Sequence, residues 1–393
     1  MADPIFKIRT YNNIAVAGLE RFPREKYEVA SEIQHPDAII LRSHKLHGEP
    51  LPDTLKAIGR AGAGVNNIPV AECTHRGIVV FNTPGANANA VKELVLAGML
   101  LACRNICQAW DYVRGLEGSD EAIHQQIESG KKRFQGFELG GKMLGVVGLG
   151  AIGVRVANKA LALGMNVSGY DPYVTVERAW QLSASVIQAS SLEELLSICD
   201  FVTLHMPLTD QTHHCINAER LQRMKPGAVL LNFSRGELVD KQAVLEALDS
   251  GRLHAYVTDF PAAVFKNHAK VIALPHIGAS TREAEENCAI MVAEQIRDFL
   301  ENGNIRHSVN FPEVVLPRAP GTTRIAIPHA NVPAMVSKIS ACLGEAGINI
   351  QELLNKSKGE VAYSLIDVEG PLHREILERI KAIPGVLSVR VVE

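Results

Sequence analysis

The chain has 393 residues and lacks the long apolar runs, targeting segments and basic tracts that mark special classes of protein. No stretch approaches the roughly eighteen apolar residues that a membrane-spanning helix needs. The N-terminus has neither the charged start nor the apolar core of a signal peptide. The longest basic run is Lys131-Lys132-Arg133 and the net charge is −3, which argues against a nucleic-acid surface. We therefore expect a cytoplasmic protein whose main partner is a small molecule, not a membrane or a nucleic acid.

The chain also lacks paired cysteines. Its seven cysteines are scattered, with no CxxC pair and no histidine at a metal-type spacing, so we expect reduced thiols and no metal site. Cys103 and Cys107 lie four residues apart within the helical stretch 91–109. A spacing of four places both side chains on one face of a helix, so we predict a buried helix face rather than a redox pair.

What the chain does contain is a dinucleotide-binding signature. Residues 143–149 are almost wholly apolar, as in a strand that is buried on both faces of a parallel sheet. A GxGxxG motif follows at 148–153, then a helical stretch over 154–163 and a second strand over 166–170. Asp171 stands directly after that strand. Together these segments predict a βαβ unit that binds a dinucleotide, rather than a chance glycine-rich turn.

Each glycine of the motif has a separate predicted role. Gly148 permits the tight turn, Gly150 lets the backbone approach a pyrophosphate, and Gly153 lets the helix pack closely against the strand. The helix N-terminus supplies unpaired N–H donors for the phosphates. Asp171 would accept hydrogen bonds from the adenosine ribose and would repel a 2′-phosphate, so we predict NAD rather than NADP as the cofactor.

The alternation of strand-like and helix-like segments predicts three domains. An α/β unit precedes the motif, a doubly wound sheet contains it, and the helical stretch 280–300 leads back to the first unit. A proline-rich linker at 314–321 precedes a last unit with the order βαββαβ. The predicted domains are a discontinuous one over 1–96 and 285–316, a nucleotide domain over 97–284, and a third over 317–393. The predicted strands outside the βαβ unit are 7–10, 38–40, 57–60, 78–81, 201–204, 228–232, 255–259, 270–273, 323–328, 350–354, 361–368 and 386–391.

Three further segments follow strand ends, at the edge where α/β sheets bind ligands. They are 204–209, 232–240 and 274–280. A guanidinium at Arg235 could clamp a carboxylate with two hydrogen bonds. An imidazole at His276 has an intrinsic pKa suited to taking a hydroxyl proton near neutrality, so it is a candidate general base.

In this order and spacing, the glycine motif and the three segments resemble the D-isomer-specific 2-hydroxyacid dehydrogenases, over residues 1 to about 315. Segments 41–43, 60–67 and 82–87 look like the substrate loops of members that act on 3-phosphoglycerate. The resemblance implies an α/β fold with a Rossmann-type doubly wound nucleotide domain inserted in a flavodoxin-like substrate domain. It also implies NAD-dependent oxidation of 3-phosphoglycerate to 3-phosphohydroxypyruvate, on the route to L-serine.

The resemblance further implies a role for each matching residue. Arg235 and the backbone N–H groups around Ala61 and Gly62 would hold the substrate carboxylate, while His276 removes the C2 hydroxyl proton and hydride leaves to NAD. Arg42 and Arg60 would face the phosphate, and Asp259 would contact the nicotinamide carboxamide. The implied cofactor-binding residues are Gly148, Gly150, Ala151, Ile152, Gly153, Asp171, His205, Pro207, Thr212, Ser234, Asp259, His276 and Gly278. The implied substrate-binding residues are Arg42, Ser43, Arg60, Ala61, Gly62, Asn87 and Arg235.

One position departs from the family pattern. The family pairs its catalytic histidine with a glutamate five residues after the counterpart of Asp259, and that position here is Val264. Such a carboxylate orients the imidazole and stabilises its charged form. We hypothesise that Asp259, Glu283 or Glu286 takes its place.

The third unit is similar to an ACT domain. In serine-regulated members of the family, residues at the positions of His329, Asn331 and Asn349 bind the amino acid. The glycine expected after Pro333 is Ala334, whose methyl group would weaken or abolish that binding. The unit could therefore bind L-serine as an effector or serve only as an assembly surface. Assembly is expected as a homodimer through the nucleotide domain, or as a homotetramer through paired ACT sheets.

Two other functions stay open. A glyoxylate or hydroxypyruvate reductase on the same scaffold would not need Arg42 and Arg60 and would rarely carry an ACT domain. A non-catalytic NAD-sensing regulator would explain the missing glutamate, but the presence of Arg235 and His276 counts against it.

Overall fold

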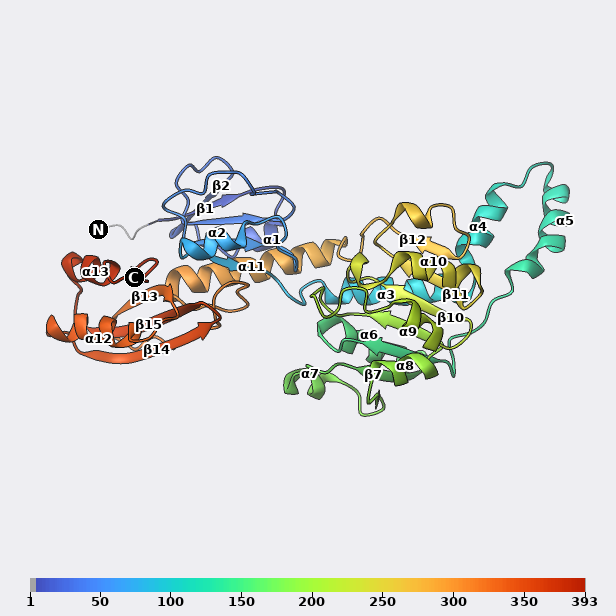
Figure 1. Ribbon diagram of the computed structural model, residues 1–393. Coiled ribbons are helices and arrows are strands. Elements are labelled where there is room, and N and C mark those ends of the chain that lie inside the picture. Colours follow the sequence, from blue (N-terminus) through green and yellow to red (C-terminus); the bar gives the residue numbers. More distant parts are fainter. Residues whose placement is uncertain (1–4, 393) are drawn as a thin grey trace. The chain divides into compact units, whose positions relative to one another are not determined.

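The computed structural model describes residues 5–392. The chain forms two compact units: unit 1 comprises Met1–Asn87 with Arg282–Glu393, and unit 2 comprises Ala88–Thr281 (Figure 1). The predicted third domain, 317–393, thus belongs to the same compact unit as the first. No helix in the part of the chain that the structure describes is long and apolar enough to cross a membrane.

Unit 2 is built on a seven-stranded parallel sheet in the order β12-β11-β10-β9-β6-β7-β8. Counted from β6, this is the doubly wound order 3-2-1-4-5-6 extended by one strand, so the predicted fold class is confirmed. The strand order reverses between β6 and β9, and sheets of this kind bind ligands at the carboxyl ends of the strands beside such a point. The strands are β6 (Met143–Val147), β7 (Asn166–Tyr170), β8 (Ile187–Gln188), β9 (Phe201–Leu204), β10 (Ala228–Asn232), β11 (Leu253–Thr258) and β12 (Val271–Ala273).

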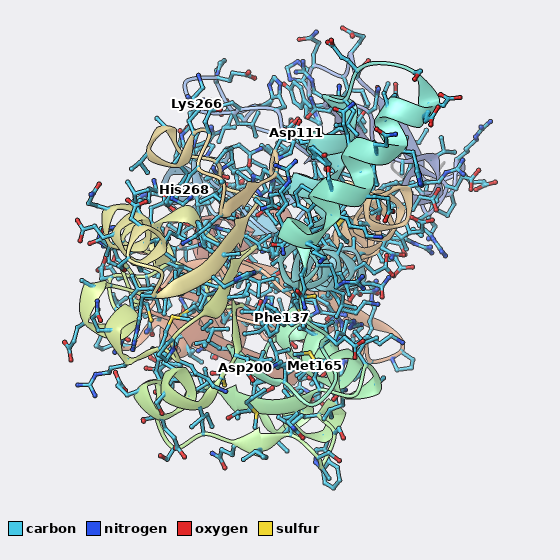
Figure 2. The ribbon with its side chains drawn as sticks, turned by 90° about the vertical axis from the view of Figure 1, so that its right-hand side faces the viewer. Asp111, Phe137, Met165, Asp200, Lys266 and His268 are labelled. Carbon is cyan, nitrogen blue, oxygen red and sulfur yellow. The ribbon has the colours of Figure 1, made fainter. Side chains whose placement is uncertain are left out.

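Helices cover both faces of this sheet, and most residues of its strands are therefore buried (Figure 1). Asp200 and Met165, labelled in Figure 2, directly precede β9 and β7 at the amino edge, away from the ligand-binding edge. The α-helices of unit 2 are α3 (Ala88–Cys103), α4 (Ile106–Arg114), α5 (Asp120–Gly130), α6 (Ala151–Ala162), α7 (Val176–Gln181), α8 (Leu192–Ile198), α9 (Ala218–Arg223) and α10 (Lys241–Asp249). The short 3₁₀ helices are η1 (Lys131–Phe134), η2 (Gly236–Leu238) and η3 (Ala263–Phe265).

The prediction of one helix over 91–109 is wrong. Helix α3 ends at Cys103, and Asn105 adopts a left-handed conformation with φ 51° before α4 begins. Asparagine tolerates this conformation better than most residues, so it can break a helix that the apolar pattern alone would continue. Cys103 is buried in the core of unit 2, and Cys107 packs half-buried against the same hydrophobic cluster from the next helix, so the two thiols lie on different helices.

The first part of unit 1 is a five-stranded parallel sheet in the order β2-β1-β3-β4-β5, which is the flavodoxin-like order. Its elements are β1 (Phe6–Thr10), α1 (Val16–Leu19), β2 (Tyr27–Ala30), β3 (Ala38–Leu41), β4 (Ala57–Arg60), α2 (Val70–His75), β5 (Val79–Phe81) and α11 (Arg282–Asn302). Helix α11 packs closely on β4, because a Cβ atom added to Gly59 would lie 2.4 Å from Cγ2 of Val292. Strand β2 was not predicted, since its four residues form only a short edge strand.

The last part of unit 1 has the predicted order βαββαβ. Its antiparallel sheet, β14-β15-β13-β16, is called the C-terminal sheet below. The elements are β13 (Thr322–Ala330), α12 (Met335–Glu345), β14 (Ile350–Lys358), β15 (Val361–Glu369), α13 (Arg374–Lys381) and β16 (Arg390–Val392). One face packs on α12 and α13, while the other shares a hydrophobic cluster with α11 and the first sheet. In Figure 1, α11 accordingly lies between the blue strands of the first sheet and the red strands of the C-terminal sheet.

Two arginines of the C-terminal sheet hold the end of α11. The fully buried Arg324 forms a bidentate ion pair with Asp367, with distances of 2.6 and 2.7 Å, and donates to the carbonyls of Asn302 and Leu316. Arg390 donates to the carbonyls of Phe299 and Leu300. Cationic donors suit the carbonyl end of a helix, where the helix dipole is negative. The proline-rich stretch after α11 is therefore a fixed connection rather than a loose linker.

Candidate functional site

The glycine motif forms an open turn at the carboxyl end of β6. Gly148 has φ +92°, and a Cβ atom there would lie 2.6 Å from the carbonyl oxygen of His205. A Cβ atom on Gly153 would lie 1.9 Å from the carbonyl oxygen of Gly148, so only glycine lets α6 pack against the turn. At Gly150, by contrast, no atom lies within 4 Å of an added Cβ. Gly148 and Gly153 thus build the turn, and Gly150 leaves open the space that a pyrophosphate needs. The turn formed by residues 148–153 is called the glycine cradle below.

Asp171 is fixed beside this turn. Its Oδ2 accepts a hydrogen bond of 2.8 Å from the N–H of Leu149, and its Oδ1 accepts one of 2.8 Å from the N–H of Tyr173. Each carboxylate oxygen can accept a second hydrogen bond. The side chain therefore stands at the end of β7 with acceptor capacity for ribose hydroxyls, which fits the adenosine half of NAD.

The loop after β9 places a neutral histidine next to the glycine turn. The Nε2 atom of His205 lies 2.9 Å from Oγ1 of Thr203, and within residues 5–392 its buried Nδ1 has no hydrogen-bond partner. Burial lowers the pKa of His205 to about 3, so the ring is uncharged near neutrality. The hydroxyl of Thr212 donates to the carbonyl of Pro207 at 2.7 Å and closes this loop.

The loop after β10 is tied to β9. The hydroxyl of Ser234 donates to the carbonyl of Leu204 at 2.7 Å, and the side-chain amide of Asn232 donates to the carbonyl of Arg235 at 2.8 Å. These bonds fix the backbone of Arg235 at the carboxyl edge, while its guanidinium stays exposed. The sequence did not single out Asn232 as a positioning residue, although it directly precedes Phe233 and Ser234 at a strand end.

Asp259 is a buried carboxylate with an unsatisfied oxygen. The residue is 1% exposed, its Oδ2 accepts a hydrogen bond of 3.1 Å from the N–H of Gly278, and no group in the described chain bonds to Oδ1. Burial raises the pKa of Asp259, and the Gly278 hydrogen bond and the charges of His276 and Arg235 oppose that rise. A buried acceptor without a donor is costly. The site therefore suits a ligand with an N–H donor, such as the carboxamide of NAD.

His276 shares a cluster with Asp259. Its backbone N–H donates to the carbonyl of Asp259 at 3.0 Å, and its ring lies with its centroid 4.8 Å from that of Phe260. The residue has φ +45°, a left-handed conformation that is uncommon for a non-glycine residue and often found at functional sites. Because Arg235 also acts electrostatically on Asp259, the carboxyl edge of unit 2 brings Arg235, Asp259 and His276 together.

The position of the missing glutamate carries no replacement acid. Val264 lies on η3 and is 36% exposed, while its neighbour Phe265 is buried against Tyr256 with ring centroids 5.2 Å apart. Of the three hypothesised substitutes, Asp259 lies in the same unit as His276 and interacts with it electrostatically. Glu286 forms an ion pair of 3.5 Å with Arg282 on α11.

In unit 1, the loop at 42–44 carries Arg42, which is predicted to face the substrate phosphate, and is called the phosphate loop below. Side chains that the sequence did not reveal hold this loop in place. The Oδ1 atom of Asn12 accepts hydrogen bonds from three successive N–H groups, those of Arg42, Ser43 and His44, at 3.4, 3.1 and 2.8 Å. The side-chain amide of Asn67 donates to the carbonyls of Arg42 and His44. The left-handed conformation of Asn12, with φ 65°, is not visible in the sequence pattern.

The two predicted phosphate-binding arginines differ in their surroundings. The Nε of Arg60 donates to the carbonyl of Arg42 at 3.0 Å, and its Nη1 donates to the carbonyl of Gly64. Arg60 therefore shapes the loop in this structure. Arg42 forms an ion pair of 2.7 Å with Glu285 in the first turn of α11, and both side chains are partly exposed. The sequence named Glu283 and Glu286 as acids of interest but not Glu285.

The other predicted substrate-binding residues follow β4 and β5. The N–H groups of Ala61 and Gly62, predicted to hold the substrate carboxylate, donate instead to the carbonyls of Leu41 and Arg60, both at 2.8 Å. In this structure they are not available to a ligand. Asn87 is the last residue of the first stretch of unit 1 and directly precedes α3.

The predicted effector residues do not come together within one chain. His329 is 1% exposed, and its Nε2 lies 3.1 Å from Oδ1 of Asn355 and 3.0 Å from Oγ of Ser364. The side chain of Asn349 donates to Glu369, which pairs with the start of β13, whereas His329 and Asn331 lie at or just beyond the other end of that strand. Asn331 donates there to the carbonyl of Gly359 at 3.0 Å.

The sheet order and the glycine cradle define a dinucleotide-binding protein of the doubly wound class, and the comparisons with known proteins agree. Residues 96–278 match the family model of the D-isomer specific 2-hydroxyacid dehydrogenase, NAD binding domain. The chain is 36% identical over 348 residues to a D-3-phosphoglycerate dehydrogenase of Haemophilus influenzae, covering 86% of this chain and 81% of that one. It is 39% identical over 301 residues to a D-3-phosphoglycerate dehydrogenase of Methanocaldococcus jannaschii, covering 74% of this chain and 54% of the relative.

Among solved structures, the NAD⁺-bound 3-phosphoglycerate dehydrogenase of Entamoeba histolytica is similar, with 30% identity and a TM-score of 0.62 over 78% of this chain and 99% of that one. The chain belongs to the D-isomer-specific 2-hydroxyacid dehydrogenases. The sequence-based predictions of the family and of NAD as the cofactor are thereby confirmed. The chain spans about half the length of the Methanocaldococcus relative.

Proposed function

We propose that the protein oxidises 3-phosphoglycerate to 3-phosphohydroxypyruvate, the activity named for its relatives. The proposal rests on the structure of the phosphate loop, which carries Arg42. Asn12, Asn67 and Arg60 hold this loop at the carboxyl end of β3, and it presents a guanidinium that a phosphate dianion would pair with. A reductase for glyoxylate or hydroxypyruvate has no phosphate to place there.

The remaining roles follow from the groups at the carboxyl edge of unit 2. NAD, when bound in the glycine cradle, supplies the hydride acceptor. Arg235 pairs with the substrate carboxylate through two hydrogen bonds, which fixes the orientation of C2. His276 accepts the C2 hydroxyl proton, a step that typically contributes roughly 10²–10⁴-fold to the rate. The unsatisfied Oδ1 of Asp259 would accept a hydrogen bond from the carboxamide of bound NAD.

We assign to Asp259 the task that the family gives to its glutamate. A carboxylate near the imidazole stabilises the imidazolium that forms on proton transfer. Asp259→Asn should lower kcat with 3-phosphoglycerate by about tenfold or more, while Glu283→Gln and Glu286→Gln should leave kcat unchanged. An unchanged kcat in all three variants would exclude these acids.

The substrate assignment is tested with pairs of substrates that differ only in the phosphate. NADH oxidation is measured with 3-phosphohydroxypyruvate, hydroxypyruvate and glyoxylate, and NAD reduction with 3-phosphoglycerate. Arg42→Gln should raise KM for the phosphorylated substrates by about tenfold or more, because a charged hydrogen bond contributes roughly 1.5–3 kcal/mol. It should leave kcat/KM for hydroxypyruvate unchanged. Turnover of only the unphosphorylated acids would overturn the proposal, and no turnover at all would favour an NAD-sensing regulator.

For the C-terminal sheet, we propose a site for L-serine between two copies of the chain. Because Asn349 and the pair His329 and Asn331 lie toward opposite ends of the sheet, one ligand could meet all three only if two copies contribute. Ala334 opposes this, since its methyl group stands in a left-handed turn at φ 64°. Inhibition by L-serine that disappears in Asn331→Ala would support the site. An uninhibited wild-type enzyme would leave the sheet with an assembly role.

The proposed assembly also uses unit 2. Helices α4 and α5 extend away from its sheet (Figure 1). Helix α4 leaves large apolar side chains exposed, among them Trp110 at 62% and Val113 at 51%. A second copy would cover this face, and Trp110→Glu would then lower the mass measured by light scattering. A cytoplasmic location, where free thiols such as those of this chain persist, completes the proposal.

A further inference from the structure

A cavity of about 320 Å³ lies within unit 1, where the first sheet meets the C-terminal sheet. Asp37 and Lys56, which line it, directly precede β3 and β4. They therefore stand at the amino edge of the first sheet, whereas Arg42 and Arg60 stand at its carboxyl edge. The cavity is thus separate from the predicted substrate site. The C-terminal sheet contributes Tyr363 of β15 and Arg390 of β16 to the lining of the cavity.

The floor of the cavity is built from buried aromatic rings. Phe299 is 3% exposed and Tyr363 is 1% exposed, and the hydroxyl of Tyr363 donates to the carbonyl of Gly303 at 2.8 Å. The guanidinium of Arg390 lies over the ring of Phe299, 4.3 Å from its centroid, and caps the end of α11. These contacts fix the floor before any ligand binds, as is usual for small-molecule sites.

The charges that line the cavity favour an anion. Lys56, Arg76 and Arg390 supply three cations, and Asp37 and Asp53 supply two carboxylates. Asp37 already pairs with Lys56 at 2.6 Å, and the fully exposed Asp53 pairs with Arg76 at 3.1 Å, an ion pair that solvent weakens.

The charge of Arg390 is opposed only indirectly, because Asp37, which already pairs with Lys56, acts on it electrostatically without forming an ion pair. Within residues 5–392, no carboxylate forms an ion pair with Arg390, which donates instead to main-chain carbonyls. Burial lowers its pKa, which reflects the cost of holding the charge there. An anion in the cavity would offset part of that cost.

We propose that this cavity binds a small anion, a carboxylate or a phosphate, between Lys56, Arg76 and Arg390. Its volume is at the lower end of the range for ligand pockets, roughly 300–1,000 Å³, which suits a metabolite of few carbon atoms. A bound anion would contact both sheets and strengthen the packing of the C-terminal sheet on α11. The proposal does not depend on the reaction catalysed at the carboxyl edge.

The test compares two lysines in matched surroundings. Lys56 pairs with Asp37, whose other oxygen accepts the N–H of Lys7, and Lys225 pairs with Asp200, whose other oxygen accepts the N–H of Met143. Both Nζ–Oδ1 distances are 2.6 Å, but only Lys56 lines the cavity. Lys56→Gln and Lys225→Gln therefore remove the same ion pair with and without the cavity.

Binding of inorganic phosphate and of malonate to the full chain is measured by isothermal titration calorimetry. Lys56→Gln should weaken one binding site about tenfold, since a charged hydrogen bond contributes roughly 1.5–3 kcal/mol, and Lys225→Gln should bind as the wild type does. Arg76→Gln, a second cavity variant, should repeat the loss. Stronger binding of phosphate identifies a phosphorylated ligand, and stronger binding of malonate a carboxylate. Unchanged binding of both anions in the two cavity variants would overturn the proposal.

Discussion

Two single methyl groups in the glycine cradle should have separate effects, one on the stability of the fold and the other on the affinity for the cofactor. In Gly153→Ala, the new Cβ would lie 1.9 Å from the carbonyl oxygen of Gly148, which is main chain and cannot swing away. The start of α6 must then shift from β6, at a cost of about 2–3 kcal/mol or more, as for other overpacked sites. In Gly150→Ala, the Cβ meets no atom within 4 Å, and the backbone, with φ −73°, suits any residue. Gly150→Ala should therefore fold as stably as the wild type, or up to about 1 kcal/mol more so.

The variant that keeps the stability of the wild type, Gly150→Ala, should be the one that loses affinity for the cofactor. The Gly150 methyl group would occupy the position through which the backbone approaches the pyrophosphate, so the Kd for NADH should rise about tenfold or more in a protein of unchanged stability. Urea unfolding gives the stability, and quenching of intrinsic fluorescence on NADH titration gives the affinity. Wild-type NADH affinity in Gly150→Ala, or wild-type stability in Gly153→Ala, would contradict this account of the two glycines.

Three further predictions concern a buried ion pair, a buried histidine and the phosphate loop. Asp367→Asn leaves the fully buried Arg324 without its counter-charge and should lower the free energy of unfolding of unit 1 by about 3–5 kcal/mol in urea titrations; a loss below 1 kcal/mol would contradict this. Because the pKa of His205 falls to about 3 in the folded chain, its unfolded form binds the proton more readily between pH 6.5 and 3. Stability should thus fall by about 1.4 kcal/mol per pH unit below 6.5, and less steeply in His205→Gln, as followed by thermal unfolding across pH. Glu285→Gln frees Arg42 from a partly exposed ion pair and should lower KM for 3-phosphohydroxypyruvate by up to about fivefold, whereas a rise in KM would show that Glu285 positions the arginine.

The fold of unit 2 was predictable because its signals are local. The strands at 166–170, 201–204 and 228–232 have the predicted bounds. The last two are short, largely apolar runs, and the first is placed by the glycine motif and helix that precede it and by Asp171 that follows it. The break at Asn105 was not predictable, because one left-handed residue interrupts an apolar pattern that continues on both sides. Strand β2 was not predictable either, because four residues at a sheet edge have too short an apolar pattern to indicate a strand.

The candidate site divides in the same way. Residues with a characteristic motif, such as Gly153 and Asp171, stand where the motif predicts. Asn12 could not be inferred, because it acts through one side-chain oxygen on a loop thirty residues away in the sequence. The N–H groups of Ala61 and Gly62 were assigned to the substrate by analogy, and only the structure shows that neighbouring carbonyls occupy them. Hydrogen bonds between residues far apart in the chain produce no periodic pattern in the sequence, so they cannot be predicted from it.

Helix α11 gives the C-terminal sheet a direct physical connection to the predicted phosphate loop. The helix has 21 residues and is therefore roughly 30 Å long. Its first turn holds Arg42 through Glu285, and its last turn is capped by Arg324 and Arg390 of the C-terminal sheet. The middle of the helix packs on Gly59 of β4 through Val292 and Ile296, so we expect a ligand that shifts the C-terminal sheet either to strain the two arginine caps or to move Glu285 as well. If Arg42 binds the substrate phosphate as proposed, we expect an effector bound to the C-terminal sheet to change KM before kcat.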